Sequence, residues 1–148
     1  MIARQKAFVA TWEVDKPVKL LHVPTKTLCY TILTENVTAL GLAPAGHVVA
    51  VATMTEPGYY VISAYQYELH TRIVIPFPIK QVAVNNTIST LAFVGAAEEL
   101  PYDVVFLYNV DRDKLTAVTH TFGLHICHLR FLTNNSLMIN AGVIVIET

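Results

Sequence analysis

Three short stretches of the chain repeat one pattern: an apolar strand, a polar turn and the start of a return strand. They occupy residues 20–28, 61–69 and 107–115. Their closing leucines are 41 residues apart from Leu28 to Leu69, and 46 residues apart from Leu69 to Leu115. A period of about 40 to 45 residues is typical of repeats in which each unit is one four-stranded blade of a β-propeller. The spacing therefore predicts a run of such blades.

The composition of the apolar runs favours strands over helices. The runs are short and rich in Val, Ile, Thr and Tyr, and turn-forming residues interrupt them about every 8 to 12 residues. We predict an all-β chain, forming a propeller segment of about three to four blades in one domain. Complete blades are expected at residues 36–77 and 78–123, with an incomplete first blade at 1–35 and an incomplete last blade at 124–148. The strands expected to be innermost, at 37–44, 79–85 and 125–132, keep the same period.

The composition is unusually apolar, with 53% hydrophobic and 14% charged residues. Blades that pack face to face bury their strands on both sides, and this explains the content of apolar residues. An open arc of three to four blades would leave apolar faces exposed at both ends. We therefore expect the chain to be a segment of a longer protein, a subunit whose partner completes the ring, or a homodimer.

A family resemblance lies in two of the repeats. Residues 37–52 and 126–141 each contain an apolar strand that ends in a turn with Pro or Asn, followed by a strand of small residues. They resemble the inner two strands of WD40-type repeats, and the likeness extends over about residues 7–147. The family's Gly-His and Trp-Asp dipeptides are absent, and Tyr108-Asn109 stands at one place where the latter would fall. The resemblance implies degenerate WD40-like blades, and it suggests that His125, near an inner strand, organises contacts between blades.

Charge and hydropathy argue against several classes of partner. The net charge of −1 provides no field for a nucleic-acid backbone or an anionic membrane. Residues 36–55 carry no charge, but the turn at 43–47 divides them into two strands, so we predict no membrane span. The N-terminus lacks the apolar run of a secretory signal, which favours an intracellular location, cytoplasmic or nuclear. Cys29 and Cys127 lie in apolar strand patterns, so we expect two core thiols and no disulfide.

No constellation of residues predicts catalysis, a cofactor or a metal site. The one metal-like cluster consists of His120, His125, Cys127 and His128. Alternate residues of a strand share a face, so only two of these can converge locally, whereas a structural zinc site needs four ligands. Catalysis by carboxylates needs a cleft that excludes solvent, whereas the clustered carboxylates lie in predicted turns, where solvent surrounds them; they are Glu98, Glu99, Asp103, Asp111 and Asp113. We predict that the chain is not an enzyme.

The expected function is a non-catalytic scaffold for protein–protein interaction. The loop at residues 96–103 interrupts an otherwise regular repeat, and loops carry function more often than the strands they connect. The candidate partner-binding residues are Glu98, Glu99, Leu100, Pro101 and Tyr102 in this loop, together with Tyr67 in another predicted turn. Two alternatives stay open: a barrel-like β-domain that binds a small molecule or metal, and a structural β-protein that self-assembles.

Overall fold

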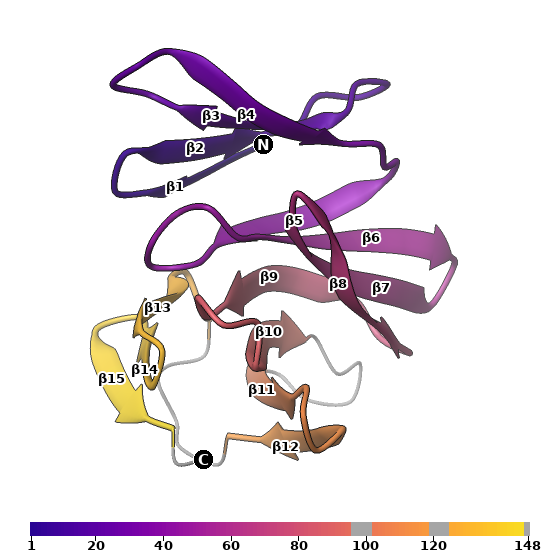
Figure 1. The fold of residues 1–148 in the computed structure, drawn as a ribbon. Coiled ribbons are helices and arrows are strands. Elements are labelled where there is room, and N and C mark those ends of the chain that lie inside the picture. The colour runs from indigo at the N-terminus through magenta and orange to yellow at the C-terminus, as the bar shows by residue number, and fades with distance from the viewer. Residues whose placement is uncertain (96–101, 119–124, 147–148) are drawn as a thin grey trace.

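The computed structural model describes residues 1–95, 102–118 and 125–146. Fifteen strands form four antiparallel sheets, arranged as a four-bladed β-propeller (Figure 1). The first sheet contains β1 (Ile2–Gln5), β2 (Phe8–Thr11), β3 (Val18–His22) and β4 (Thr27–Ile32), and the second contains β5 (Val37–Leu42), β6 (Val49–Glu56), β7 (Tyr59–Gln66) and β8 (Glu68–Ile75). The third contains β9 (Ile79–Val84), β10 (Thr90–Gly95), β11 (Val104–Asn109) and β12 (Lys114–Ala117), and the fourth contains β13 (Leu129–Thr133), β14 (Ser136–Ile139) and β15 (Gly142–Val145). The prediction of an all-β propeller is confirmed.

Each sheet is a meander in which consecutive strands are hydrogen-bonded neighbours. The innermost strands are β1, β5, β9 and β13; each contacts the next, and together they line one central cavity. In Figure 1 the first sheet lies above the second, and the third and fourth lie side by side below it. The inner strands predicted from the repeat period correspond to β5, β9 and β13.

The first sheet differs from the sequence-based expectation. It has four strands rather than three, because Ile2–Gln5 pairs with Phe8–Thr11 as an inner strand. The expectation of an incomplete first blade was therefore wrong. This strand has only four residues and includes the exposed Arg4, so it carries no apolar run by which to recognise it. The fourth sheet has three strands within the described part of the chain.

Three apolar clusters hold successive sheets together. Leu20 and Val51 belong to the cluster between the first and second sheets. Ile62 and Phe93 belong to the cluster between the second and third sheets, and Phe131 belongs to the cluster between the third and fourth. All five side chains are fully or almost fully buried. Burial of this kind is the main stabilising term of a fold. No fourth apolar cluster among the described residues joins the last sheet to the first.

The first and last sheets meet through a polar contact. The side chain of Gln5 on β1 donates a hydrogen bond from Nε2 to the carbonyl oxygen of Phe131 on β13, at 3.3 Å. One such bond contributes on the order of 1 kcal/mol, much less than a buried apolar cluster. Among the described residues, the outward face of the fourth sheet therefore has no apolar cluster to cover it.

The inner strands approach one another closely at Gly41 on β5. A Cβ atom placed there would lie 2.1 Å from the carbonyl oxygen of Val82 on β9. Only glycine allows two backbones to come this near. Residue 41 therefore fixes the distance between the second and third blades near the axis.

The barrel architecture of the small-molecule or metal-binding alternative was wrong, because the described strands form four separate sheets and no single closed one. Within the ranges that the structure describes, no helix has the length and apolar character needed to cross a membrane.

Candidate functional site

The residues predicted to bind a partner do not form one surface in the described structure. Tyr67 occupies the turn between β7 and β8, with φ of 65°, and is 67% exposed. Tyr102 precedes β11 and is 44% exposed. In a four-stranded meander the connection before the third strand and the turn after it lie at opposite ends of the sheet, so these tyrosines lie at opposite ends of their blades. Glu98, Glu99, Leu100 and Pro101 lie outside the described residues.

Tyr67 also has a packing role. Its ring lies against that of Tyr30 on β4, with 4.8 Å between the ring centroids. The Tyr30 hydroxyl donates to the carbonyl oxygens of His47 at 2.8 Å and Tyr65 at 3.3 Å. Burial raises the pKa of this hydroxyl well above its usual range. Tyr30 therefore joins the first sheet to the second by hydrogen bonds that need its proton.

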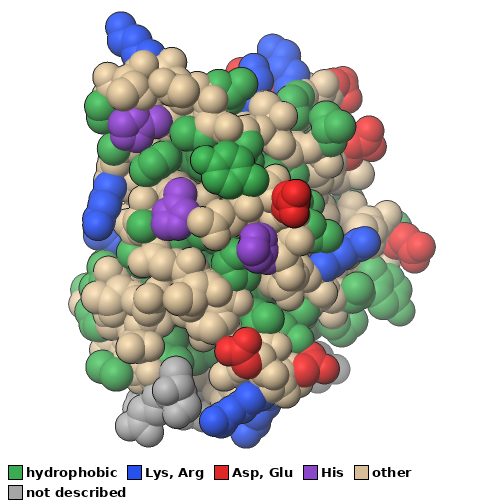
Figure 2. Space-filling model, viewed as in Figure 1, with side chains coloured by type: hydrophobic (Ala, Val, Ile, Leu, Met, Phe, Trp, Pro, Cys, Tyr) green, Lys and Arg blue, Asp and Glu red, His purple; other side chains and the backbone are tan. Residues whose placement is uncertain are grey.

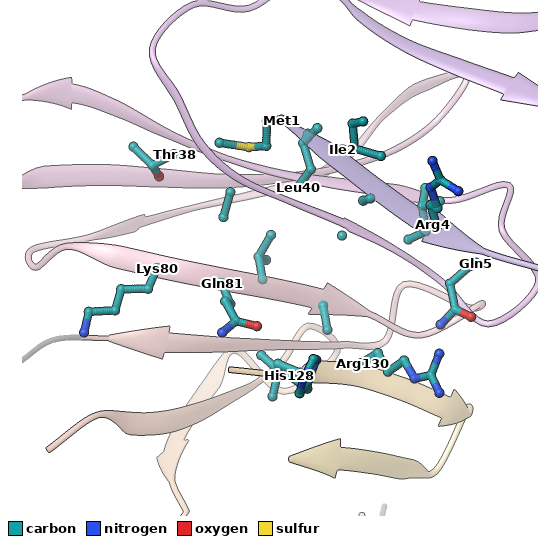
Figure 3. Close-up of a pocket in the computed structure, with 17 residues that line it drawn as sticks. Met1, Ile2, Arg4, Gln5, Thr38, Leu40, Lys80, Gln81, His128 and Arg130 are labelled. Carbon is teal, nitrogen blue, oxygen red and sulfur yellow. The ribbon is translucent and has the colours of Figure 1, made fainter. Parts of the chain in front are cut away.

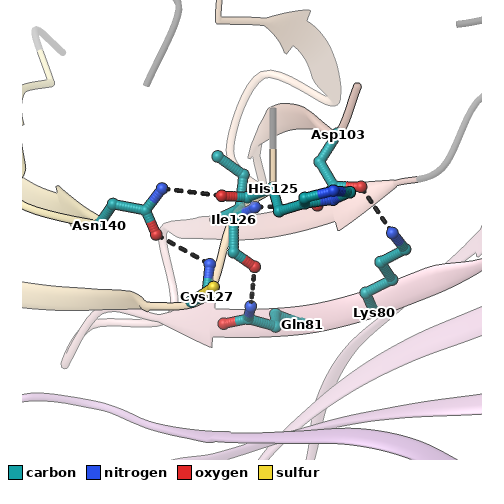
Figure 4. Close-up of polar contacts among 7 residues, drawn as sticks. All are labelled: Lys80, Gln81, Asp103, His125, Ile126, Cys127 and Asn140. Carbon is teal, nitrogen blue, oxygen red and sulfur yellow. Dashed lines mark hydrogen bonds and ion pairs between the residues drawn. The ribbon is translucent and has the colours of Figure 1, made fainter. Parts of the chain in front are cut away.

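The segment that contains three of the metal-like residues is fixed by Asn140 (Figure 4). The Asn140 Oδ1 accepts from the backbone N–H groups of Cys127 at 2.8 Å and His128 at 3.2 Å, and its Nδ2 donates to the carbonyl oxygen of His125 at 3.0 Å. Backbone atoms rather than imidazole nitrogens make these bonds. They position the entry to β13, the innermost strand of the fourth sheet.

The described part of the chain contains no group of side chains arranged as a metal site, and its two cysteines lie apart. Within it, no three His, Cys, Asp or Glu side chains are close enough to hold a metal ion, and His120 lies outside it. Both cysteines are free thiols. Cys29 is half-buried beside the first apolar cluster, but Cys127 is exposed, so the expectation of a core residue at 127 was wrong. Its strand pattern was misread because β13 begins only at Leu129.

Asp103 was expected to be a solvated turn residue, and the structure shows otherwise. Its side chain is only 6% exposed and accepts hydrogen bonds from Lys80 Nζ at 2.6 Å and the Ile126 N–H at 2.9 Å (Figure 4). Burial opposes ionisation of this carboxyl group, but these two bonds outweigh it and lower its pKa. Gln81 Nε2 donates to the Ile126 carbonyl at 2.5 Å. These contacts attach the start of the fourth sheet to the third.

The central cavity is the first candidate site. Its volume is about 390 Å³, and the four inner strands line it. Among the 17 residues that line it, Arg4, Lys80 and Arg130 carry positive side chains and none is Asp or Glu. Figure 3 shows Arg4 and Arg130 toward one end of the cavity and Lys80 toward the other. Since Lys80 Nζ is paired with Asp103, the positive charge of the lining comes from Arg4 and Arg130 at one end of the cavity.

The second candidate site is the open edge, which we define as the side of β15 (Gly142–Val145) with which no described strand pairs. The N–H of Ile146 donates to the carbonyl oxygen of Asn135 at 2.7 Å, and the register between β14 and β15 is regular. Since hydrogen-bonded and non-bonded pairs alternate in antiparallel strands, Val143 and Val145 direct their N–H and C=O groups away from β14. No described strand pairs with these groups.

The side chains beside the open edge are apolar and exposed. Val143 is 54% exposed and Val145 is 75% exposed. Arg130, Met138 and Val143 are directly paired across the three strands and so share the outward face of the sheet. The opposite face carries Phe131, which packs on the third sheet. The fourth sheet therefore presents an edge with which no described strand pairs and an exposed apolar strip, where the sequence predicted an incomplete last blade with an exposed apolar face.

The distribution of charge is even on the face shown in Figure 2. Acidic and basic side chains lie mostly near the outline, and hydrophobic side chains are scattered between them. Neither sign of charge forms a continuous patch on this face.

Comparisons with known proteins identify the fold only. No protein-family model and no curated protein matches the chain. Among solved structures, it is similar to hydrazine synthase of Kuenenia stuttgartiensis, with a TM-score of 0.58 and 10% identity over 93% of this chain and 40% of that one. It is also similar to an uncharacterised protein of Listeria monocytogenes EGD-e, with a TM-score of 0.61 and 10% identity over 88% of this chain and 40% of that one. The chain thus spans 40% of the length of each, and the likeness extends to a propeller-like arrangement of sheets.

Proposed function

We propose that the chain is a non-catalytic scaffold that binds another protein through its fourth sheet, as a degenerate WD40-like module. The observation that carries this proposal is the open edge together with its exposed valines. Edge strands present unpaired N–H and C=O groups, and proteins usually protect them with charge, proline or a covering segment. Here the outermost side chains of the edge, Val143 and Val145, are both apolar and exposed. A partner that covers them would satisfy the backbone groups and bury the valines.

The proposal includes an intracellular setting, cytoplasmic or nuclear, in keeping with the two free cysteines. The partner is a protein that completes the propeller from the fourth sheet. A homodimer, in which a second copy covers this face, is the competing form of assembly. A larger self-assembled structure would form only if the contacts between copies did not produce a closed, symmetric oligomer.

The test compares two valine variants. Val145→Lys places a charge beside the open edge, and Val14→Lys is the matched control, because Val14 is 72% exposed on the loop between β2 and β3 of the first sheet. Neither substitution alters a buried side chain, so both variants should unfold within about 0.5 kcal/mol of the parent chain. A partner captured with the parent chain is identified by mass spectrometry, purified and titrated by calorimetry.

We expect Val145→Lys to weaken this binding at least about tenfold, which corresponds to about 1.4 kcal/mol. Val14→Lys should bind as the parent chain does. Equal affinities for both variants would contradict a binding surface on the fourth sheet. A parent chain that captures no partner protein would contradict the scaffold itself.

The central cavity supports a second candidate function, the binding of a small anion. The specific observation is that Arg4 and Arg130 line one end of it and form no salt bridge with a described residue, whereas Lys80 is paired with Asp103. Guanidinium groups bind phosphate and carboxylate oxygens in paired hydrogen bonds. Titration with inorganic phosphate, followed by NMR, should shift the backbone resonances of β1 and β13. Arg130→Gln should abolish these shifts, whereas Lys19→Gln, an exposed change on β3, should preserve them. Equal shifts in both variants would argue against this site.

A further inference from the structure

We infer that the open edge accepts an extended segment of the partner as an added outer strand, and that this segment carries a carboxylate opposite Arg112 and Lys114. The inference rests on the proposed function and names the chemistry of the partner at the same surface. It has three parts: a vacant strand position, a cavity that the added strand would cover, and a local excess of positive charge.

The vacant position follows from comparing the four sheets. In the first three, an outer strand (β4, β8 or β12) pairs with the third strand of its sheet. The fourth sheet ends at β15 within the described residues. Since Val143 and Val145 direct their backbone groups outward, two N–H and two C=O groups are available in the alternation that an antiparallel strand requires. Strand addition of this kind is a recurrent mode of peptide recognition.

A cavity of about 400 Å³ lies between β15 and the outer strands of the third sheet. Its lining includes Leu107 from β11, Lys114 and Thr116 from β12, and Ile144 from β15. Leu107 pairs with Thr116, so both belong to the face of the third sheet that is turned toward the fourth. On the other face of the third sheet, Tyr108 and Leu115 lie beside residues of β8, the outer strand of the second sheet. An outer strand on the fourth sheet would stand in the equivalent place and cover Lys114 and Thr116.

The charge of this cavity selects the chemistry of the segment. Among the described residues that line it, Arg112 and Lys114 are charged and none is Asp or Glu. Neither Arg112 nor Lys114 forms a salt bridge with the residues that the structure describes. A residue of the added strand that is paired with Ile144 would have its side chain on the same face as Ile144, toward these cations. A carboxylate at this position would form the charge-assisted hydrogen bonds that guanidinium and ammonium groups favour.

The same charges argue against a second copy as the occupant. A β15 strand from another copy would offer side chains from Gly142–Val145, and none of these is acidic. Its own Arg112 and Lys114 would bring further positive charge to the assembly. Like charges brought together oppose binding, whereas an acidic segment neutralises the cavity. The observations therefore favour a partner segment over self-pairing.

The test uses the whole chain and three synthetic peptides. The first is acetyl-Thr-Val-Glu-Val-Thr-Val-amide, whose valines would share the face of Val143 and Val145 and whose glutamate would face the cavity. The second replaces the glutamate with lysine. The third carries N-methyl groups on its valines, which removes the donors that an added strand directs at β15. Binding is followed by NMR titration and by hydrogen exchange at the amides of Val143 and Val145.

We expect the glutamate peptide to slow exchange at both amides and to bind about tenfold more tightly than the lysine peptide. The N-methylated peptide should give neither effect. The variant Lys114→Glu should reverse the preference between glutamate and lysine, whereas Lys19→Glu on the first sheet should not change it. These outcomes together would support an acidic added strand.

Three results would overturn the inference. Protection by the glutamate and lysine peptides alike would remove the charge selection but leave the scaffold in place. Slow exchange at Val143 and Val145 without peptide, growing with protein concentration, would identify a second copy as the occupant. Unchanged exchange with every peptide would refute strand addition, while the Val145→Lys titration with the purified partner would still decide the scaffold independently.

Discussion

Phe131 provides the sharpest test of how the fourth sheet is held. Its side chain is fully buried between β13 and the third sheet, beside Ile139 and Val94 in the same cluster. Truncation of a buried phenylalanine to alanine costs about 3 to 5 kcal/mol, because apolar contacts are lost and a cavity remains. The neighbouring Leu132 is 40% exposed and lies outside the cluster. Phe131→Ala should therefore destabilise the chain far more than Leu132→Ala, for which we expect about 1 kcal/mol.

The assay is urea unfolding followed by circular dichroism, with thermal unfolding as a second measurement. At this chain length each kcal/mol shifts the melting temperature by about 2 to 4 °C, so Phe131→Ala should lower it by about 6 to 20 °C. The free energy lost in Phe131→Ala is a large part of a typical stability of about 5 to 15 kcal/mol. Phe131→Leu is a milder variant that still folds, because we expect it to cost only roughly 1 to 2 kcal/mol. Equal losses for Phe131→Ala and Leu132→Ala would refute the packing of the fourth sheet on the third by this face.

Three further predictions concern contacts within and between blades. Tyr30→Phe removes the proton donor to two carbonyl oxygens and should lower the free energy of unfolding, measured in urea, by about 1 to 3 kcal/mol. Because the folded pKa of Tyr30 is raised, the stabilisation by its hydroxyl is complete below about pH 10 and falls above it, so the variant should lose less stability than the parent chain between pH 9 and about 11. Gly41→Ala forces a Cβ against the Val82 carbonyl and should lower stability by about 1 to 3 kcal/mol, and an unchanged melting temperature would refute the close approach. Asp103→Asn removes the ion pair with Lys80. Because the folded pKa of Asp103 is lowered, the stability advantage of the parent chain should be full above about pH 4 and shrink below it. A constant difference in stability between pH 7 and about 3 would contradict this.

The repeat period was sufficient to predict the propeller. The spacing of Leu28, Leu69 and Leu115 reflects the recurring turn between the third and fourth strands of each complete sheet. The period works because each blade needs the same number of residues to cross the sheet four times. It could not find β1, because an inner strand of four residues with the exposed Arg4 has no hydrophobic signature of its own. Its place comes from pairing with β2 and from contact with β5.

The site was less predictable than the fold. Tyr67 and Tyr102 were chosen because they lie in turns, without regard to the end of the blade at which the strand order places each turn. The repeat period predicted an incomplete last blade, but no local pattern in Gly142–Val145 shows that Val143 and Val145 are exposed beside its edge. Asp103 was read as solvated because its partners, Lys80 and Ile126, are 23 residues away in either direction. Contacts of this kind become visible only when successive sheets are placed side by side.

The most direct test of the propeller is an NMR measurement of proximity between inner strands of different sheets. The position of a Cβ at Gly41 is 3.3 Å from the Cα of Ala83, although β5 and β9 belong to separate sheets. We predict a nuclear Overhauser effect between the Hα protons of Gly41 and Hα of Ala83, without the cross-strand amide contacts of a hydrogen-bonded ladder between these strands. A continuous ladder joining β5 to β9, or no contact between Gly41 and Ala83, would contradict four blades arranged around a common axis.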